Sequence, residues 1–161
     1  MKLKEFVIGQ LAAAKFLFDT FTKDFSDEDA KYQPCDGGIH LNWMLVHLAV
    51  SADSMISKIA GEPKKLSEAL HTAYAGGSTC KPDDGMTRAE AQKLYDQWHE
   101  RTVEFVKSFD EARYDEKAPQ GFPELFPTAG SVIGLLATHP FWHFGQLTVN
   151  RRMLKKPKLL G

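Results

Sequence analysis

The stretch LLATHPFWHFGQLTVNRRML, residues 135–154, decides the fold because its residues are typical of one long helix that carries two histidines. His139 and His143 are four residues apart, so at about 100° per residue both imidazoles lie on one face, one turn apart. Two neutral imidazoles so placed can bind one divalent metal ion. Gln146 and Asn150 continue this polar stripe among apolar neighbours, and we predict that they orient ligands or water. The alternative is a pair of hydrogen-bonded core histidines.

Length and composition are those of an ordinary globular chain. The 161 residues are 43% hydrophobic and 25% charged, with eleven Phe, which is enough to form a sizeable core. We therefore expect one domain that spans residues 1–161. The net charge of −1 recruits neither nucleic acid nor an anionic membrane. Because no apolar run approaches the length of a bilayer span, we expect no membrane partner.

The cysteines and the first helix predict a cytoplasmic protein. Cys35 and Cys80 are the only cysteines and form no CxxC pair, which favours two free thiols in a reducing cytosol. The N-terminal Lys and the apolar residues after it superficially resemble a signal peptide. However, Gln10 and Lys15 interrupt the run and its spacing is helical, so we predict a structural helix.

Apolar residues recur at spacings of three and four in four segments, which predicts four helices. The segments cover residues 2–24, 40–60, 87–110 and 128–154. Gly61 followed by Pro63 ends the second helix, and Thr87 with Glu90 forms a capping box at the third. Thr128 can cap the fourth. Four amphipathic helices of this length predict an all-α four-helix bundle.

The connections between these helices contain glycine and proline, and no alternating strand pattern persists. Residues 25–39 and 111–127 are expected to be loops. Residues 61–86 are rich in Gly, Pro and Lys, and we predict a crossover connection with a short turn at residues 66–74. Because this connection between the second and third helices is long, those two helices can run parallel.

A third histidine lies in the middle of the second helix. His47 occupies an apolar stripe, where a lone histidine is usually a satisfied core residue. In a four-helix bundle, metal sites are built from side chains on facing helices, so His47 could join His139 and His143 as a third ligand. Three protein ligands leave positions open for water or substrate, which is typical of a catalytic site. Imidazole ligands suit Zn, Ni, Cu or Fe alike, and protons should compete for them near pH 6.5.

Other polar and aromatic side chains are weaker candidates for contacts to a ligand. Gln10 lies within the apolar stripe of the first helix and could contact a bound molecule or reach solvent. Trp43 and His40 precede the second-helix histidine by one and two turns, so they could line a cofactor pocket. We expect His40 at an exposed helix start, and we expect His71 and His99 to be solvated.

Pro140 directly follows His139, so the HExxH arrangement with its built-in glutamate base is absent. Proline also lacks the N–H that would bond to Leu136 and crowds that carbonyl. We predict either a tolerated kink or a kink that aims His139 at the metal.

Three segments resemble the DinB-like superfamily. They are WMLVHLAVSAD at residues 43–53, HPFWHFGQLTVNRR at residues 139–152 and KPKLLG at residues 156–161. The most specific part is the HxxxHxGQ signature formed by His139, His143, Gly145 and Gln146. The resemblance covers nearly the whole chain, including the crossover with AYAGGS and the capped third helix.

The resemblance implies a bundle with up-down-down-up topology and a divalent metal bound by His47, His139 and His143. Some relatives are thiol-dependent transferases or isomerases that use bacillithiol, mycothiol or glutathione, and others have no known reaction. The leading hypothesis is a metal-dependent enzyme that acts on a small molecule with such a thiol. The alternatives are a metal-dependent hydrolase and a non-enzymatic, stress-associated metal-binding bundle. The resemblance and the many aromatic residues also imply a homodimer.

Overall fold

The computed structural model describes residues 2–159, and these form five α-helices. They are α1 (Leu3–Thr22), α2 (Leu41–Ala60), α3 (Glu68–Tyr74), α4 (Arg88–Ser108) and α5 (Ala129–Met153). Short 3₁₀ turns at Asp29–Lys31 and Glu111–Arg113 lie in the loops. Since no strand forms within residues 2–159, the all-α prediction is confirmed. The four long helices end within two residues of their predicted bounds.

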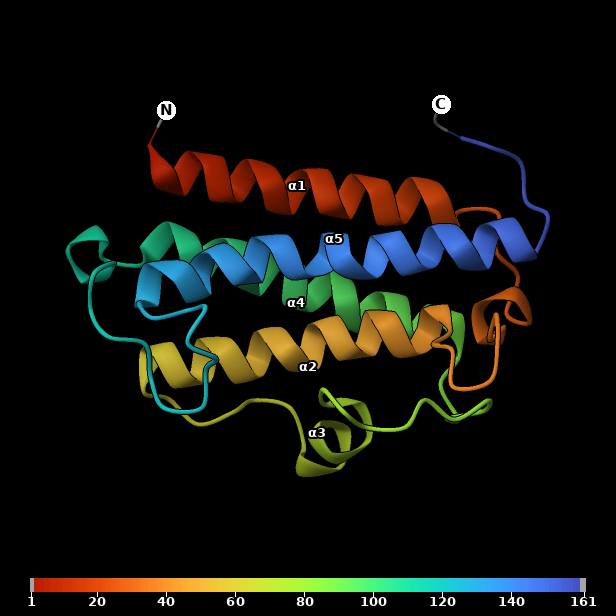
Figure 1. Ribbon diagram of the computed structural model, residues 1–161, viewed down its shortest axis with the longest axis horizontal. Helices are drawn as coiled ribbons and strands as arrows, with labels where there is room; N and C mark the ends of the chain where they lie inside the picture. The colour runs from red at the N-terminus through yellow and green to blue at the C-terminus, as the bar shows by residue number, and fades with distance from the viewer. Residues whose placement is uncertain (1, 160–161) are drawn as a thin grey trace.

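The four long helices lie alongside one another, and the short α3 lies outside them (Figure 1). In this view, α1 and α5 run in one direction, whereas α2 and α4 run in the other. α1 packs mainly on α5, and α2 mainly on α4. The predicted turn at residues 66–74 is α3, which packs against α2. None of the helices within residues 2–159 has the length and apolar character needed to cross a bilayer.

Local hydrogen bonds at the helix ends explain where the helices begin and end. The predicted capping box is present at α4, where the Glu90 N–H donates to Thr87 Oγ1 and the Thr87 N–H donates to Glu90 Oε2. Thr128 caps α5 through reciprocal bonds with Ser131. Gly61 ends α2 with a φ of 69°, which favours glycine because it lacks a Cβ.

His40 caps α2 from a fully buried position, so the exposed helix start expected from the sequence is wrong. Its Nδ1 accepts the Trp43 N–H at 3.1 Å, and its Nε2–H donates to the Lys81 carbonyl at 2.8 Å. Nδ1 therefore caps α2, and Nε2 joins the start of α2 to the segment before α4.

A buried carboxylate holds the crossover against α2. Asp53 is 1% exposed and accepts the N–H groups of Lys65 and Leu66 at 3.0 and 2.9 Å. His71 Nε2 donates to Asp53 Oδ2 at 2.9 Å, and the His71 side chain is buried within α3. The prediction of a solvated His71 in a loop is therefore wrong. These bonds position α3 beside the central part of α2.

Apolar side chains form two clusters, one toward each end of the bundle. One contains Phe18, Met44 and Leu147, from the end of α1, the first half of α2 and the second half of α5. The other contains Val7 and Ile133, from the opposite ends of α1 and α5. The central turns of α2 and α5 lie where the two clusters meet, and these turns carry the polar residues of the candidate site.

Candidate metal centre

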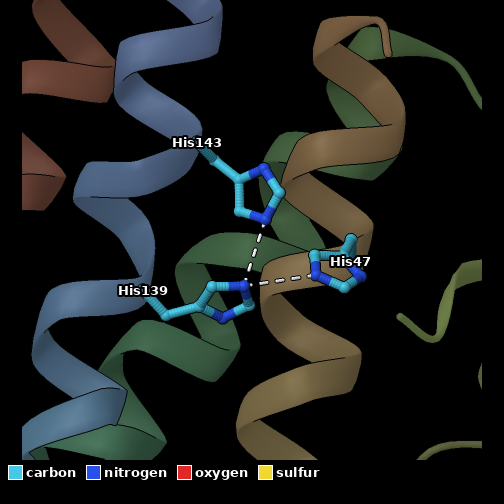
Figure 2. A group of neighbouring side chains, drawn as sticks. All are labelled: His47, His139 and His143. Carbon is cyan, nitrogen blue, oxygen red and sulfur yellow. Dashed lines mark hydrogen bonds between the residues drawn. The ribbon is translucent and has the colours of Figure 1, made fainter. Parts of the chain in front are cut away.

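Three histidine side chains from α2 and α5 converge on one point between these helices (Figure 2). His139 Nε2 lies 3.3 Å from His47 Nε2 and 3.1 Å from His143 Nε2. His47 and His143 are 5% and 8% exposed, and His139 is half-buried. The structure thus brings together the three residues that the sequence analysis proposed as ligands, and their nitrogens are close enough to share one ion.

Hydrogen bonds to the outer nitrogens determine which nitrogen carries a lone pair. His47 Nδ1–H donates to the Tyr74 carbonyl at 2.6 Å, and His143 Nδ1–H donates to Gln146 Oε1 at 2.7 Å. A neutral imidazole carries only one N–H, so Nε2 of both rings presents its lone pair toward the centre. This is the tautomer, held by an outer acceptor, that metal-ligating histidines use.

The spacing of the nitrogens fits a divalent metal ion. His139 Nε2–H can donate to only one of the two lone pairs that face it, and the Ser51 hydroxyl, 3.3 Å from His47 Nε2, is within reach of the other. Tetrahedral coordination with metal–nitrogen bonds of 2.0–2.1 Å separates the ligand nitrogens by roughly 3.3–3.4 Å. The observed 3.1 and 3.3 Å are close to this value.

Burial keeps the three imidazoles neutral. Loss of solvation, followed by the proximity of His143 and His47, lowers the pKa of His139 to about 3. Burial and His47 lower the pKa of His143 to about 4, partly opposed by the bond to Gln146. The pKa of His47 is also lowered by burial, against the effect of the Tyr74 carbonyl. The cluster is therefore in its ligating form at pH 7.

Two tryptophans restrain the histidine rings. Trp43 stacks on His47 with ring centroids 4.5 Å apart and an interplanar angle of 9°. Trp142 meets His139 edge to face at 5.7 Å, and its side chain is 57% exposed. Trp43 was predicted to contact a cofactor, and the structure places its ring against the imidazole of His47.

A small pocket adjoins the cluster on the α4 side. Its volume is about 30 Å³, which is room for about one water molecule, and His139, His99 and Tyr95 line it. His99 is half-buried and burial lowers its pKa, so the solvated position expected for it is wrong.

A larger cavity of about 370 Å³ lies between α2, α3 and the loop before α5. Ser51, His71 and Phe122 are among its lining residues. The Ser51 hydroxyl also lies 3.3 Å from His47 Nε2, so it faces both this cavity and the cluster. Sequence reasoning gave Ser51 no role, although its position one turn after His47 was a usable signal. The Tyr74 carbonyl was also missed, because a backbone partner leaves no side-chain pattern.

The family of the chain follows from comparison with known proteins. A family model described as the DinB superfamily matches residues 10–147, a range that contains all three histidines. The chain belongs to the DinB superfamily. The resemblance based on the HxxxHxGQ signature is thereby confirmed. No curated protein matches the chain.

A solved structure supports the fold of this DinB superfamily member. The chain is similar to a crystal structure described as "the conserved protein of locus from Enterococcus faecalis", with 17% identity and a TM-score of 0.68. The alignment covers 96% of this chain and 98% of that chain. At this identity the likeness shows the shared fold alone.

Two other candidate residues, Asn150 and Gln10, lie away from the three histidines. Asn150 is buried, and its Nδ2 donates to the Ile39 and Tyr32 carbonyls at 2.9 and 3.3 Å, which fixes the loop before α2 to α5. Gln10 is half-buried on α1, and no hydrogen bond within residues 2–159 joins it to the histidines. Only Gln146, of the two polar residues predicted to orient ligands, bonds to the cluster.

Proposed function

We propose that this DinB superfamily member is a metal-dependent enzyme in which His47, His139 and His143 bind one divalent ion. The observation that carries the proposal is the convergence of three Nε2 atoms, two of which present fixed lone pairs. When bound, the ion would supply a Lewis acid that holds a thiol as its thiolate or polarises an electrophile. Zn, Ni and Fe all suit imidazole ligands.

The 370 Å³ cavity is the proposed site of a small-molecule substrate. Ser51 connects it to the cluster, and Val50, Met55 and Phe122 give it apolar walls. Small-molecule sites usually combine such walls with a few polar groups that fix orientation. In this proposal the Ser51 hydroxyl orients the polar end of the substrate, and Phe122 excludes water from its apolar part.

The proposed reaction is an S-transfer that consumes a low-molecular-weight thiol, or an isomerisation in which such a thiol adds to the substrate and is released again. Family membership and the imidazole donor set support this class, because an imidazole-bound ion accepts thiolate ligands. The proposal includes a single-domain bundle with up-down-down-up topology and a long crossover between α2 and α4. It also includes a cytoplasmic location, where free Cys35 and Cys80 stay reduced.

Hydrolysis is a second candidate, and one observation favours it. His71 lines the 370 Å³ cavity, and its Nε2 is bonded to buried Asp53. A histidine oriented by a carboxylate in this way is a common general base. The third candidate, a stress-associated bundle that binds metal without turnover, needs only the three histidines.

Metal analysis of the purified protein tests the site. The parent and a His99→Ala control should contain one divalent ion per chain, whereas His143→Ala should contain none and remain folded. A folded His143→Ala variant with full metal content would rule out the site.

Thiol consumption across a panel of electrophiles tests the reaction class. Metal-dependent loss of thiol supports transfer, and rearrangement that requires thiol without consuming it supports isomerisation. Product release without thiol supports hydrolysis. Full metal content without turnover supports the non-enzymatic candidate. Ser54→Trp, which places an indole in the 370 Å³ cavity, should abolish turnover without loss of metal. Unchanged turnover in Ser54→Trp would exclude this cavity as the substrate site.

A further inference from the structure

A buried pair of a histidine and a carboxylate lies beside the 370 Å³ cavity, on the α3 side. His71 Nε2–H donates to Asp53 Oδ2 at 2.9 Å, and the two side chains are 5% and 2% exposed. His71 belongs to α3, a helix that supplies none of the three clustered histidines, and it lines the cavity. The pair is therefore a second chemical group at the proposed substrate site, separate from the candidate metal centre.

The contacts of Asp53 determine which nitrogen of His71 carries the lone pair. The Asp53 carboxylate accepts the backbone N–H groups of Lys65 and Leu66 as well as His71 Nε2–H. All three partners are N–H donors, so the proton between the two side chains belongs to His71 Nε2. A neutral imidazole carries one N–H, so His71 Nδ1 presents a lone pair.

This lone pair is accessible to a molecule in the cavity. No hydrogen bond within residues 2–159 occupies His71 Nδ1, and this atom is not one of the unpaired polar atoms that are closed off from solvent. Because His71 lines the cavity, Nδ1 opens onto it. Ser51 lines the same cavity and lies beside His47, so a substrate that contacts Ser51 and His71 would lie between this lone pair and the histidine cluster.

We propose that His71 Nδ1 is the general base that ionises the thiol co-substrate of the S-transfer. An ordinary thiol has a pKa of about 8.5 and is mostly protonated at pH 7, whereas the thiolate is the nucleophile. A histidine within reach of the S–H group supplies the missing proton acceptor. This role rests on the proposed function, and it goes beyond it in naming the residue that activates the thiol.

The step transfers one proton and exchanges one bond for another. His71 Nδ1 takes the S–H proton, the sulfur forms a bond to the electrophilic carbon, and the leaving group departs with the electron pair of its bond. The proton on Nδ1 then passes to the leaving group or to water. Asp53 is a positioning residue, because it keeps the other proton on Nε2 and holds Nδ1 toward the cavity.

The tautomer of His71 can be measured without metal and without turnover. Long-range ¹H–¹⁵N spectra of the metal-free full-length protein resolve the two nitrogens of each imidazole, and loss of signals in His71→Gln assigns this ring. At pH 7.5 the proton should be on Nε2 and the lone pair on Nδ1. A tautomer with its proton on Nδ1 overturns the proposal.

Two thiols of different acidity test the role of His71 in turnover. At pH 7.5, 2-mercaptoethanol is mostly protonated, whereas 5-thio-2-nitrobenzoate is already a thiolate, so only the first needs a base. The electrophile is the one that the metal-loaded parent protein consumes fastest. His71→Gln should lower kcat/KM about a hundredfold with 2-mercaptoethanol and leave it almost unchanged with 5-thio-2-nitrobenzoate.

Ser67→Ala controls for a merely structural role of α3. Ser67 caps α3 by accepting the Leu70 N–H, and it is not part of the cavity wall. Its loss should change the rates with the two thiols by the same factor. In an active parent, a His71→Gln variant that loses rate equally with both thiols, or with neither, overturns the role of His71 and leaves the proposed function standing. A parent that consumes neither thiol with any electrophile overturns the S-transfer, and this role with it.

Discussion

At the scale of single residues, the two polar side chains that continue the α5 stripe have different partners. Gln146 accepts from His143 Nδ1, whereas Asn150 donates to two carbonyls of the loop before α2. The same spacing in the sequence therefore leads to a contact with the histidine cluster in one case and to a packing contact in the other.

Substitution of these two residues should separate metal affinity from stability. Gln146→Ala removes the acceptor that holds the His143 tautomer, so metal affinity should fall about tenfold with little change in the free energy of unfolding. Asn150→Ala leaves two carbonyls without a donor, so it should lower the free energy of unfolding by about 1–3 kcal/mol and leave metal affinity unchanged. Calorimetric metal titration and urea denaturation measure the two quantities, and the reverse pattern would contradict both assignments.

The lowered pKa values of the histidines make the stability of the metal-free protein depend on pH. Their pKa values in the folded state are below the unfolded value of about 6.5, near 3 for His139 and near 4 for His143. Between these values the unfolded chain binds more protons, so stability is complete above pH 6.5 and decreases as the pH falls toward 4. We therefore expect proton competition for a bound metal to begin at a lower pH than the value near 6.5 that holds for free histidine.

Urea denaturation between pH 7.5 and pH 5 measures this dependence. Each such histidine contributes a slope of up to about 1.4 kcal/mol per pH unit, so His139→Leu should flatten the profile of the metal-free protein. Parallel profiles for the parent and His139→Leu would show that His139 is protonated equally in both states.

At the scale of elements, α5 continues from Ala129 to Met153 although Pro140 lies inside it. The missing N–H removes one intrahelical bond directly after His139, and proline in a helix interior usually costs about 3 kcal/mol or more. If the bend at Pro140 orients His139 toward the metal, Pro140→Ala should give a folded, more helical protein with lower metal affinity. Circular dichroism and metal titration measure this, with Thr138→Ala as an exposed control. Unchanged affinity would show that Pro140 has no role in the site.

Much of the fold could be predicted because helical periodicity and capping are local. The Thr87–Glu90 capping box, the Gly61 helix end and the facing of His139 and His143 all depend on neighbours within a few residues. The buried roles of His40 and His71 could not be predicted, because their partners Lys81 and Asp53 are 41 and 18 positions away. Neither helical periodicity nor capping indicates these pairings.

At the scale of the whole molecule, large apolar side chains remain exposed on the packed pair α1 and α5. Phe6, Phe16 and Trp142 are 46%, 65% and 57% exposed. This exposed apolar surface supports the proposed homodimer. Phe16→Glu should shift sedimentation toward monomer, whereas Leu125→Glu, at an exposed loop position, should have no effect. A parent protein that sediments only as monomer at micromolar concentration would contradict the dimer.

The hydrogen bond from His47 to the Tyr74 carbonyl links the cluster to the last residue of α3. When α3 detaches from α2, His47 loses the acceptor that holds its tautomer, so the detached state binds metal more weakly. Metal should therefore slow amide hydrogen exchange in α3, a segment that supplies no metal ligand, by mass action on the docked state. Exchange in the distant Glu111–Arg113 turn provides the reference. Equal protection of both segments would mean that metal binding does not stabilise the docked position of α3.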